Sequence, residues 1–333
     1  MNPKYSIAIP AYNRREYLRQ AIQSVLEQTV SDWEVVVSDD CSTQDLAAVV
    51  EAFNDSRVSY HRSPDHLGAT KNSQRAVNLS KGQYVITLNS DDLLLPKCLE
   101  RVGACLDQNP GFGAVYCSVT YLKDGRVSGC QHVPNIQHAD AEVLAAQPWL
   151  EKYVGTTPSC CAFRKEAFER ISGYRTFLRF AYDWDFYMRM LRLGGGVIFL
   201  PEIIGIYRQH EEQMVLNHSM DGLRDILDLW CLPEYQHWPA SFLTDNVINE
   251  VRILQLQGQS AGMVLREVLN RKLFLKLAWG LPGPVWNRLS RRFRQARTSI
   301  DENYTVPTNL DEAIATANRL LGSRTSDVGS AIQ

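Results

Sequence analysis

The sequence lacks the features that mark several classes of protein. Its eight cysteines include no CxxC pair, which argues against a zinc site and a disulfide scaffold and indicates a reducing compartment. No run approaches the ~20 apolar residues that a membrane-spanning helix needs. The N-terminal residues lack the charged-then-apolar pattern of a secretory signal. We therefore expect a cytoplasmic protein.

The sequence also lacks a strong net charge and a dinucleotide-binding loop. The formal net charge of −2 gives no general attraction to nucleic acid, and no nucleic-acid partner is expected. No GxGxxG motif follows the first predicted strand, which argues against a Rossmann dehydrogenase. With 333 residues, 45% of them hydrophobic and 22% charged, the chain is long enough for a large α/β domain and an extension.

What the first hundred residues do contain is a regular alternation of strand and helix patterns. The strands expected there lie at residues 5–9, 33–38, 58–61 and 84–88, and the helices at 16–28, 46–53 and 69–79. Pro10 is expected to end the first strand, and Gly82 is expected to be the C-cap of the third helix. This order favours a doubly wound, mostly parallel sheet.

Later segments continue the mixed pattern. The expected elements are a helix at 98–109, a strand at 114–119, a hairpin turn at Asp124-Gly125, a strand at 158–163, a helix at 164–171, a helix opening at 183 and a strand at 197–200. Residues 131–150 are expected to form a loop with a short helix. From about residue 217 onward the spacing of apolar residues is mostly helical.

Two of the early strands end in adjacent carboxylates. Asp39 and Asp40 follow one of them, and Asp91 and Asp92 follow another. Because ligands of parallel sheets bind at the carboxyl ends of the strands, we expect these four carboxylates to border one cleft. Adjacent carboxylates repel unless a cation compensates them, and Mg²⁺ or Mn²⁺ bound to carboxylates and substrate phosphates is suitable. The alternative is that these residues only cap the helices that follow.

Seven short motifs, in order along the chain, resemble those of family 2 glycosyltransferases. They lie at residues 9–13, 37–43, 68–72, 89–92 with Pro96, 173–175, 183–189 and 207–210. The resemblance covers about residues 4 to 212. It implies the nucleotide-diphosphosugar transferase (GT-A) fold, a Rossmann-like mostly parallel sheet between helix layers, and a metal-dependent transfer that inverts the sugar.

The resemblance also implies which residues bind the nucleotide. Asp39 matches the carboxylate that accepts a hydrogen bond from a uracil-type base, so a UDP-sugar is the expected donor. Lys71 stands where the family usually has arginine, and it lacks the guanidinium fork that makes bidentate contacts. The other nucleotide-binding residues that the resemblance implies are Pro10, Ala11, Tyr12, Asn13, Asp91 and Arg208.

The metal ligands are implied in the same way. Asp92, with Asp91 and His210, is expected to hold Mn²⁺ or Mg²⁺ against the two phosphates. Asn89 stands where the family often has a third aspartate, so this chain contributes less negative charge there.

Inversion needs one base that takes the proton of the acceptor hydroxyl. Asp183 matches the catalytic aspartate of the family, and Asp185 is the second candidate. Tyr182 replaces a residue that is commonly glutamate, so the choice between the two aspartates stays open. Trp184 is a candidate platform for sugar stacking, with core packing as the alternative.

The predicted domains are a catalytic domain at 1–215, a helical extension at 216–322 and a disordered tail at 323–333. Residues 268–300 contain eight basic residues and no Asp or Glu, interleaved with Trp, Phe and Leu. This pattern is typical of helices lying on anionic lipid, so a peripheral location on the inner face of the cytoplasmic membrane is one expectation. A helical hairpin packed on the catalytic domain is the other.

We therefore expect a glycosyltransferase that moves a sugar to a glycan or lipid-linked acceptor in cell-surface polysaccharide or glycolipid assembly. A homo-oligomer is one option for its assembly state. Two rival functions remain. A sugar nucleotidyltransferase usually has a glycine-rich phosphate loop after its first strand, where this chain has residues 10–13. A sugar-nucleotide-binding protein without catalysis is the second rival, which the departures at Asn89 and Tyr182 leave open.

Overall fold

The computed structural model describes residues 2–131, 133, 136–140, 142–143, 157–211, 213, 219–235, 315–316 and 319. These residues belong to two compact units. The first contains the described residues up to Phe177, then Tyr182–His210 and residues 315, 316 and 319. The second contains Leu178–Ala181 and the described residues from Glu211 to Tyr235. The predicted membrane-binding segment at 268–300 and the predicted tail at 323–333 lie outside the described residues.

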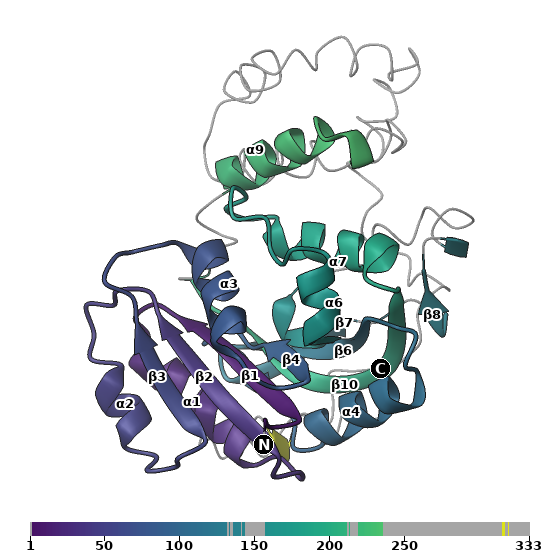
Figure 1. Cartoon of the computed structure of the whole chain (residues 1–333). Helices are drawn as coiled ribbons and strands as arrows, with labels where there is room; N and C mark the ends of the chain where they lie inside the picture. Colours follow the sequence, from purple (N-terminus) through teal and green to yellow (C-terminus); the bar gives the residue numbers. More distant parts are fainter. Residues whose placement is uncertain are drawn as a thin grey trace. The chain divides into compact units, whose positions relative to one another are not determined.

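The first unit is built on a single mixed sheet (Figure 1). Its strands lie side by side in the order β3-β2-β1-β4-β9-β6-β10-β5. Their bounds are β1 (Tyr5–Ala11), β2 (Trp33–Asp39), β3 (Val58–Arg62), β4 (Tyr84–Thr87), β5 (Leu93–Leu94), β6 (Ala114–Lys123), β9 (Cys161–Arg164) and β10 (Val197–Gln209). The first four strands are parallel, as is β10 with β6, whereas β9 and β5 are antiparallel to their neighbours. The expected mostly parallel sheet is confirmed.

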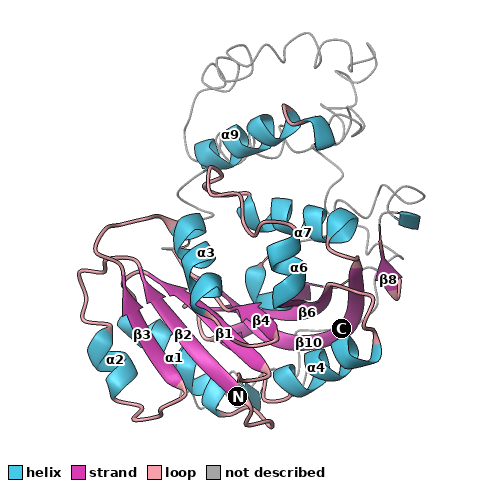
Figure 2. Cartoon of the chain, viewed as in Figure 1, coloured by secondary structure: helices cyan, strands magenta, loops and turns pink. Residues whose placement is uncertain are grey.

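Helices cover both faces of this sheet (Figure 2). One face carries α1 (Arg15–Leu26), α2 (Ala47–Glu51) and α4 (Cys98–Gln108), and the other carries α3 (Ala69–Leu79), α6 (Lys165–Arg170) and α7 (Tyr182–Leu193). The remaining elements are β7 (Arg126–Gln131), β8 (His138–Ala139) and the 3₁₀ turn η2 (Pro158–Cys160), with α9 (Ser219–Trp230) and the 3₁₀ turn η3 (Pro233–Tyr235) in the second unit. No helix within the described ranges is long and apolar enough to cross a membrane.

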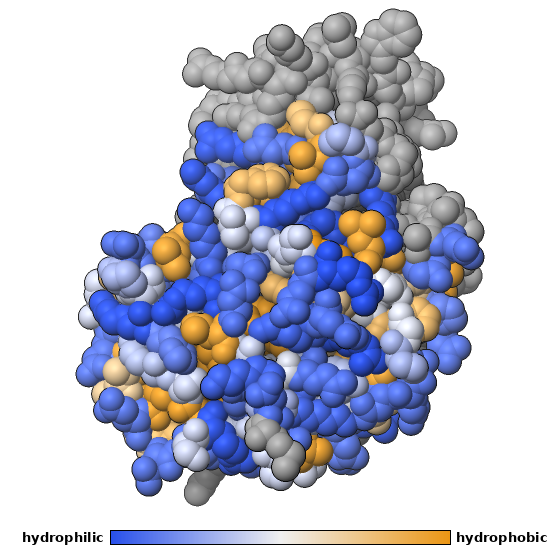
Figure 3. Space-filling model, viewed as in Figure 1, coloured by the Kyte–Doolittle hydropathy of each residue, from blue (hydrophilic) through white to orange (hydrophobic). Residues whose placement is uncertain are grey.

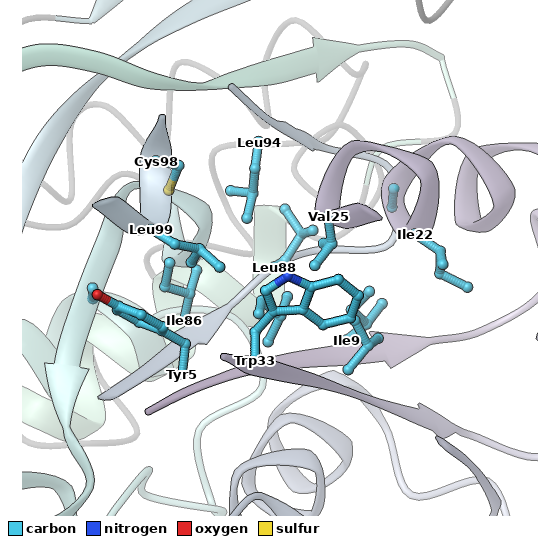
Figure 4. Close-up of a cluster of buried hydrophobic side chains, with 14 of the residues drawn as sticks. Tyr5, Ile9, Ile22, Val25, Trp33, Ile86, Leu88, Leu94, Cys98 and Leu99 are labelled. Atoms are coloured by element: carbon cyan, nitrogen blue, oxygen red, sulfur yellow. The ribbon is translucent and has the colours of Figure 1, made fainter. Parts of the chain in front are cut away.

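One hydrophobic core lies between the sheet and the helices α1, α2 and α4. Ile22 and Val25 of α1 and Leu99 of α4 are fully buried against Ile86 of β4 and Trp33 of β2 (Figure 4). Burial of each such side chain contributes about 1.5–3 kcal/mol. On the face of the described residues that Figure 3 shows, hydrophobic residues form small patches separated by hydrophilic ones.

The predicted hairpin turn is confirmed. Asp124 and Gly125 have φ values of 50° and 74°, the left-handed pair of a type I′ turn between β6 and β7. The helix predicted at 69–79 is also confirmed with the same bounds as α3.

Pro10 does not end the first strand, because β1 continues to Ala11 and pairs Pro10 with Ser38. Ala8 accepts a hydrogen bond from Leu88, so the backbone of Ala8, and of Pro10 two residues on, faces the β4 side. Pairing with β4 stops at Ala8 and Thr87. A proline therefore fits there, since its missing N–H would have had no strand partner on that side.

Gly82 is not the C-cap of α3. The helix ends at Leu79 with Ser80 as its C-cap, and the Nζ of Lys165 donates to the carbonyls of Val77 and Ser80 at 2.7 and 2.6 Å. Gly82 instead lies against β1, where its N–H donates to the Oγ of Ser6 at 2.7 Å. A glycine is needed for this close approach, not for a left-handed turn.

We expect Gly82→Ala to lower the free energy of unfolding by about 1–3 kcal/mol, since the side chain overpacks a buried contact. The added Cβ would lie 2.6 Å from both the backbone nitrogen and the Oγ of Ser6. Urea denaturation measures the effect. Gly111→Ala is the matched control, because its Cβ meets no atom within 4 Å and should change stability by less than about 0.5 kcal/mol. Equal effects of the two substitutions would contradict this account of Gly82.

The strand predicted at 158–163 begins later than expected. Residues Pro158–Cys160 form a 3₁₀ turn, and β9 starts at Cys161. The side chain of Thr157 accepts a hydrogen bond from the backbone N–H of Ser159, and Pro158 stands at the first position of the turn, where its missing N–H costs nothing. This turn brings Ser159 to the carboxyl end of β4.

Candidate active site

The carboxyl ends of β1, β2 and β4 meet at a topological switch point. The chain runs from β1 to β2 and β3 on one side, then returns through α3 to place β4 on the other side of β1. Ala11 is in register with Asp39, and Ala8 with Thr87. Ligands of open α/β sheets bind at such a point, so the segments after these three strands form the candidate site.

Asp39, at the end of β2, is completely buried and held by four donors. Its Oδ1 accepts from the backbone N–H of Ser42 at 3.0 Å and from the hydroxyl of the same residue. Its Oδ2 accepts from the Tyr60 hydroxyl at 2.6 Å and from an Arg62 Nη1 at 3.3 Å. Burial, with the hydrogen bond to Asp39 as second cause, raises the pKa of Tyr60 to about 12.

Asp40 belongs to a different environment from Asp39. Its carboxylate oxygens accept from the backbone N–H groups of Leu67 and Gly68 at 2.6 and 2.9 Å, and His66 Nδ1 lies 3.0 Å away. Only 2% of Asp40 is exposed. Asp40 fixes the glycine-containing loop before α3, because those loop N–H groups need an acceptor. That it borders the same cleft as the other three carboxylates stays a prediction.

Asn13 joins the end of β1 to the loop after β2. Its φ is 56°, and its Oδ1 accepts from the backbone N–H groups of Thr43 and Gln44 at 3.0 and 3.3 Å. Its own N–H donates to the Oγ of Ser42 at 2.7 Å. The neighbouring Tyr12 is 45% exposed, and its ring lies 4.6 Å from the ring of His66.

The expected site residues on α3 and β1 differ in exposure. Lys71 is exposed in the first turn of α3. The next residue, Asn72, is buried and donates to the carbonyl of Ser38 at 2.8 Å, which fixes the helix to the end of β2. Ala11 is buried and Pro10 is half-buried in β1.

Asp91 meets two basic side chains at one carboxylate oxygen. Its Oδ2 lies 2.7 Å from Nη1 of Arg14 and 3.1 Å from Nε2 of His210. The Asp91 and His210 side chains are 15% and 11% exposed. Arg14 was not among the residues selected from the sequence, because a single arginine after a strand carries no distinguishing pattern.

Asp92 is buried beside Asp91. Its Oδ2 accepts from the Ser159 hydroxyl at 2.7 Å and from Asn89 Nδ2 at 3.2 Å, and its Oδ1 accepts from the backbone N–H of Arg208 at 3.0 Å. Burial, and second the negative charge of Asp91, raise the pKa of Asp92 to about 7. A neighbouring cation would therefore stabilise the ionised pair.

The Arg208 guanidinium, which the sequence motif suggests for phosphate binding, contacts other residues of the protein. Its Nε donates to the backbone carbonyl of Asp91 at 2.8 Å, its Nη2 donates to Oε1 of Gln20 at 2.7 Å, and its guanidinium lies 4.5 Å from the ring centre of Tyr17. Only 7% of Arg208 is exposed. These contacts hold the Asp91 backbone in position against α1.

Asp183 lies in the first turn of α7, where the helix dipole favours a carboxylate. It is half-buried, as is Trp184, whose backbone N–H donates to Asp183 Oδ1 at 2.7 Å. Burial raises the pKa of Tyr207 above its ordinary value, and the charges of Asp92, Asp91 and Asp183 add to that effect in this order. The charges of all three carboxylates therefore act on one tyrosine, although the carboxylates come from two distant parts of the sequence.

Asp185 has different surroundings from Asp183. It is completely buried, with Oδ1 3.0 Å from Arg175 Nη1 and Oδ2 2.8 Å from Arg189 Nε. Arg189 also donates to the carbonyls of Ile171 and Gly173 at 2.6 and 2.7 Å. This network fixes the segment after α6 to α7.

The donors at this site suit a divalent ion in kind. Asp91 and Asp92 offer carboxylate oxygens, and His210 offers an imidazole nitrogen. Mn²⁺ binds both kinds of ligand, whereas Mg²⁺ prefers the carboxylate oxygens. Within the part of the chain that the structure describes, no three His, Cys, Asp or Glu side chains converge closely enough to hold an ion as they stand. Asp92 is turned toward Ser159, and Arg14 contacts Asp91. Binding an ion would require these contacts to change.

Curated relatives match part of the chain. An uncharacterized glycosyltransferase of Haemophilus influenzae is 29% identical over 56% of this chain and 62% of its own length. The putative colanic acid biosynthesis glycosyl transferase WcaA of Escherichia coli is 30% identical over 57% of this chain and 67% of its own length. The GalNAc(5)-diNAcBac-PP-undecaprenol beta-1,3-glucosyltransferase of Campylobacter jejuni is 31% identical over 38% and 41%. The first of these matches spans less than two thirds of the relative.

Solved structures show the same fold. Residues 1–349 of Staphylococcus aureus TarS, in complex with UDP, superpose with a TM-score of 0.63 at 15% identity, over 98% of this chain and 94% of that one. The mannosyltransferase PcManGT of Pyrobaculum calidifontis, in complex with GDP-Man and Mn²⁺, gives a TM-score of 0.55 at 17% identity, over 98% and 89%. Both are GT-A glycosyltransferases, so the expected fold class is confirmed.

The family model described as glycosyl transferase family 2 matches residues 6–172, which include β1 to β4 and the segments after them that carry Asp39, Asp91 and Asp92. With the switch-point site and the shared fold, this match confirms the resemblance seen in the motifs. The chain belongs to glycosyl transferase family 2.

Proposed function

We propose that this protein transfers a sugar from a nucleotide diphosphosugar, a UDP-sugar, to an acceptor hydroxyl with inversion at the anomeric carbon. One observation carries the proposal above the others. Besides burial, the charges of Asp92, Asp91 and Asp183 all raise the pKa of Tyr207, which supports a site that combines carboxylates for the diphosphate end with a carboxylate for the acceptor. A nucleotide-binding protein without catalysis would not need the third carboxylate.

The nucleotide would lie across the ends of β1 and β2, beside Pro10, Ala11, Tyr12 and Asn13. The exposed ring of Tyr12 offers a stacking surface to the base. Asp39 already accepts four hydrogen bonds, about the capacity of one carboxylate. A base N–H would therefore have to replace a donor, and the Arg62 contact is the longest of the four at 3.3 Å. TarS structures with UDP and with UDP-GlcNAc support this choice of nucleotide by fold.

The diphosphate would lie at the end of β4. We propose that Asp91, Asp92 and His210 hold Mn²⁺ or Mg²⁺ there, which supplies positive charge to the departing diphosphate. Arg208 keeps the Asp91 backbone in place through its 2.8 Å hydrogen bond to the carbonyl, and Lys71 on α3 offers an exposed positive charge. Arg208 thus has a positioning role in this proposal, in place of the direct phosphate contact that the motif suggested.

Asp183 is the proposed general base. The acceptor oxygen attacks the anomeric carbon, the bond from that carbon to the diphosphate oxygen breaks, and the diphosphate leaves with the electron pair. The proton of the acceptor hydroxyl passes to a carboxylate oxygen of Asp183. Asp185 is the weaker candidate because its two oxygens already face Arg175 and Arg189 in the interior. Trp184 beside the base is the proposed contact for the acceptor or the transferred sugar.

The acceptor is proposed to be a growing glycan or a lipid-linked sugar. The names of WcaA and of the Campylobacter glucosyltransferase support a role in polysaccharide or glycolipid assembly. The basic and aromatic segment at 268–300 is proposed to bind anionic membrane. Sedimentation with vesicles containing about 30% anionic lipid tests this, and equal recovery with neutral vesicles would contradict it.

Release of nucleotide from a panel of UDP-, GDP- and dTDP-sugars, each with Mn²⁺ or Mg²⁺, tests the function. We expect turnover of a UDP-sugar that is lost when EDTA is added. Binding of a nucleotide sugar without turnover, even with lipid-linked acceptors present, would favour the non-catalytic protein instead. Failure to bind any of these nucleotides in calorimetry would contradict the proposal altogether.

A further inference from the structure

Arg14 is held in an unusual backbone conformation at the mouth of the site. It follows β1 and precedes α1, with φ 62° and ψ 52°, and the preceding Asn13 has φ 56°. Few residues other than glycine adopt this left-handed region, and arginine has no special tolerance for it. The turn is fixed nonetheless, because the side chain of Asn13 accepts hydrogen bonds from Thr43 and Gln44.

This turn brings the Arg14 guanidinium to Asp91. Nη1 of Arg14 is 2.7 Å from Oδ2 of Asp91, and the two side chains are 25% and 15% exposed. His210 approaches the same oxygen at 3.1 Å. The two residues of the pair are 77 positions apart in the sequence, so the contact depends on the switch-point topology and on the left-handed turn.

The same carboxylate is one that the proposed function assigns to a divalent ion. A guanidinium hydrogen-bonded to this oxygen and a divalent ion bound to the same carboxylate would repel each other, since both are positive. Arg14 places a positive charge beside Asp91, the neighbour of Asp92 in the sequence. A divalent ion bound there would weaken the attraction of Asp91 for the guanidinium, and the donor phosphates would offer Arg14 another negatively charged partner.

We propose that Arg14 is an exchangeable counter-cation: it neutralises Asp91 in the empty site and moves to a phosphate oxygen of the donor when a divalent ion occupies the carboxylates. This inference rests on the proposed nucleotide-sugar site. The planar guanidinium suits phosphate because it donates two parallel hydrogen bonds. Arg14 thereby links occupation of the metal site to capture of the diphosphate.

The test measures two affinities of the full chain. Mn²⁺ binding without nucleotide is followed by the electron paramagnetic resonance signal of the free ion, and UDP binding at saturating Mn²⁺ is followed by calorimetry. For Arg14→Ala we expect Mn²⁺ alone to bind about fivefold more tightly, since a competing positive charge is lost. We expect UDP to bind about 10- to 100-fold more weakly, since a hydrogen bond to a charged group is lost. Arg14→Lys should lie between wild type and Arg14→Ala in both measurements.

Two further variants protect the interpretation. Arg14→Gly removes the side chain and suits the left-handed backbone, so it reports the same two affinities if Arg14→Ala folds poorly. Arg19→Ala is the matched control, because Arg19 lies on α1, the helix that follows Arg14, and its guanidinium pairs with the exposed Glu16 at 2.6 Å. It should change neither affinity.

The inference is overturned if Arg14→Gly binds Mn²⁺ no more tightly than wild type, or if it binds UDP equally well. If Arg14 were purely structural, replacing it would weaken the binding of both Mn²⁺ and UDP. For Mn²⁺ this is the opposite of the tighter binding that the inference predicts. Wild-type protein that binds no UDP at all would contradict the proposed function itself. If wild type binds UDP and the Arg14 variants bind it equally well, this inference fails while the proposed function stands.

Discussion

Asp183→Asn is expected to lower kcat for sugar transfer by about 10²- to 10⁴-fold, the usual contribution of a general base. Asparagine keeps the shape of the side chain but cannot take the acceptor proton. Because Asp183 lies on α7 and the proposed nucleotide ligands lie after β1, β2 and β4, the affinity for the donor nucleotide should stay within about twofold of wild type. Initial rates and calorimetric binding of UDP measure the two effects.

Glu166→Gln is the matched control for Asp183→Asn. Glu166 is also a carboxylate in the first turn of a helix, but it is exposed on α6. It should leave both kcat and nucleotide affinity unchanged. An Asp183→Asn enzyme with wild-type kcat would remove Asp183 as the base, and one that no longer binds UDP would make it a nucleotide ligand instead.

Asp185→Ala is expected to lower the free energy of unfolding by about 3–5 kcal/mol, the cost of breaking a buried ion pair. The substitution takes the counter-charge from Arg189, which is only 5% exposed, and from Arg175. It also loosens the segment from Ile171 to Gly173, whose carbonyls Arg189 binds. Urea denaturation followed by circular dichroism measures the loss.

A surface pair provides the comparison for Asp185→Ala. Glu16→Ala breaks the ion pair between Glu16 and Arg19, whose side chains are 62% and 49% exposed. It should lower the free energy of unfolding by no more than about 1 kcal/mol. Asp185→Asn, which keeps the size but not the charge, should be less damaging than alanine. If Asp185→Ala were as stable as wild type but inactive, Asp185 would be the better candidate for the base.

Much of the fold follows from short-range pattern in the sequence. The alternation of apolar strands and amphipathic helices up to residue 109 predicts the parallel part of the sheet, since each crossover needs a helix. Two later strands, β6 and β10, are longer than their apolar patterns predict. β10 continues from Val197 to Gln209 through Pro201 and two register shifts against β6, and these irregularities interrupt the apolar pattern.

The structural roles of Gly82 and Pro10 could not be predicted from the residues next to them in the sequence. Both residues usually end an element, and here each is placed by a neighbouring strand. Gly82 is set by the backbone of Ser6, and Pro10 by the point where β4 stops pairing. Their roles depend on contacts between residues far apart in the sequence, about which spacing carries no information.

The candidate site divides in the same way. The carboxylates Asp39, Asp91 and Asp92 stand directly after predicted strands, so chain order and the switch-point rule place them. Their partners could not be predicted. Tyr60 reaches Asp39 from β3, Ser159 reaches Asp92 from a turn 67 residues later, and Arg14 reaches Asp91 through a left-handed turn. Asp40 also follows a predicted strand, yet its carboxylate binds the loop before α3. Two adjacent carboxylates need not share one function.

The most direct measurement of the central claim is the anomeric configuration of the transferred sugar, read from the anomeric proton by NMR as the product forms. With an α-linked UDP-sugar and a suitable acceptor, a single displacement assisted by Asp183 predicts a β-linked product from the wild-type chain, which Asp183→Asn forms about 10²- to 10⁴-fold more slowly. An α-linked product would contradict the proposed mechanism, because retention requires a different sequence of bond changes at the anomeric carbon.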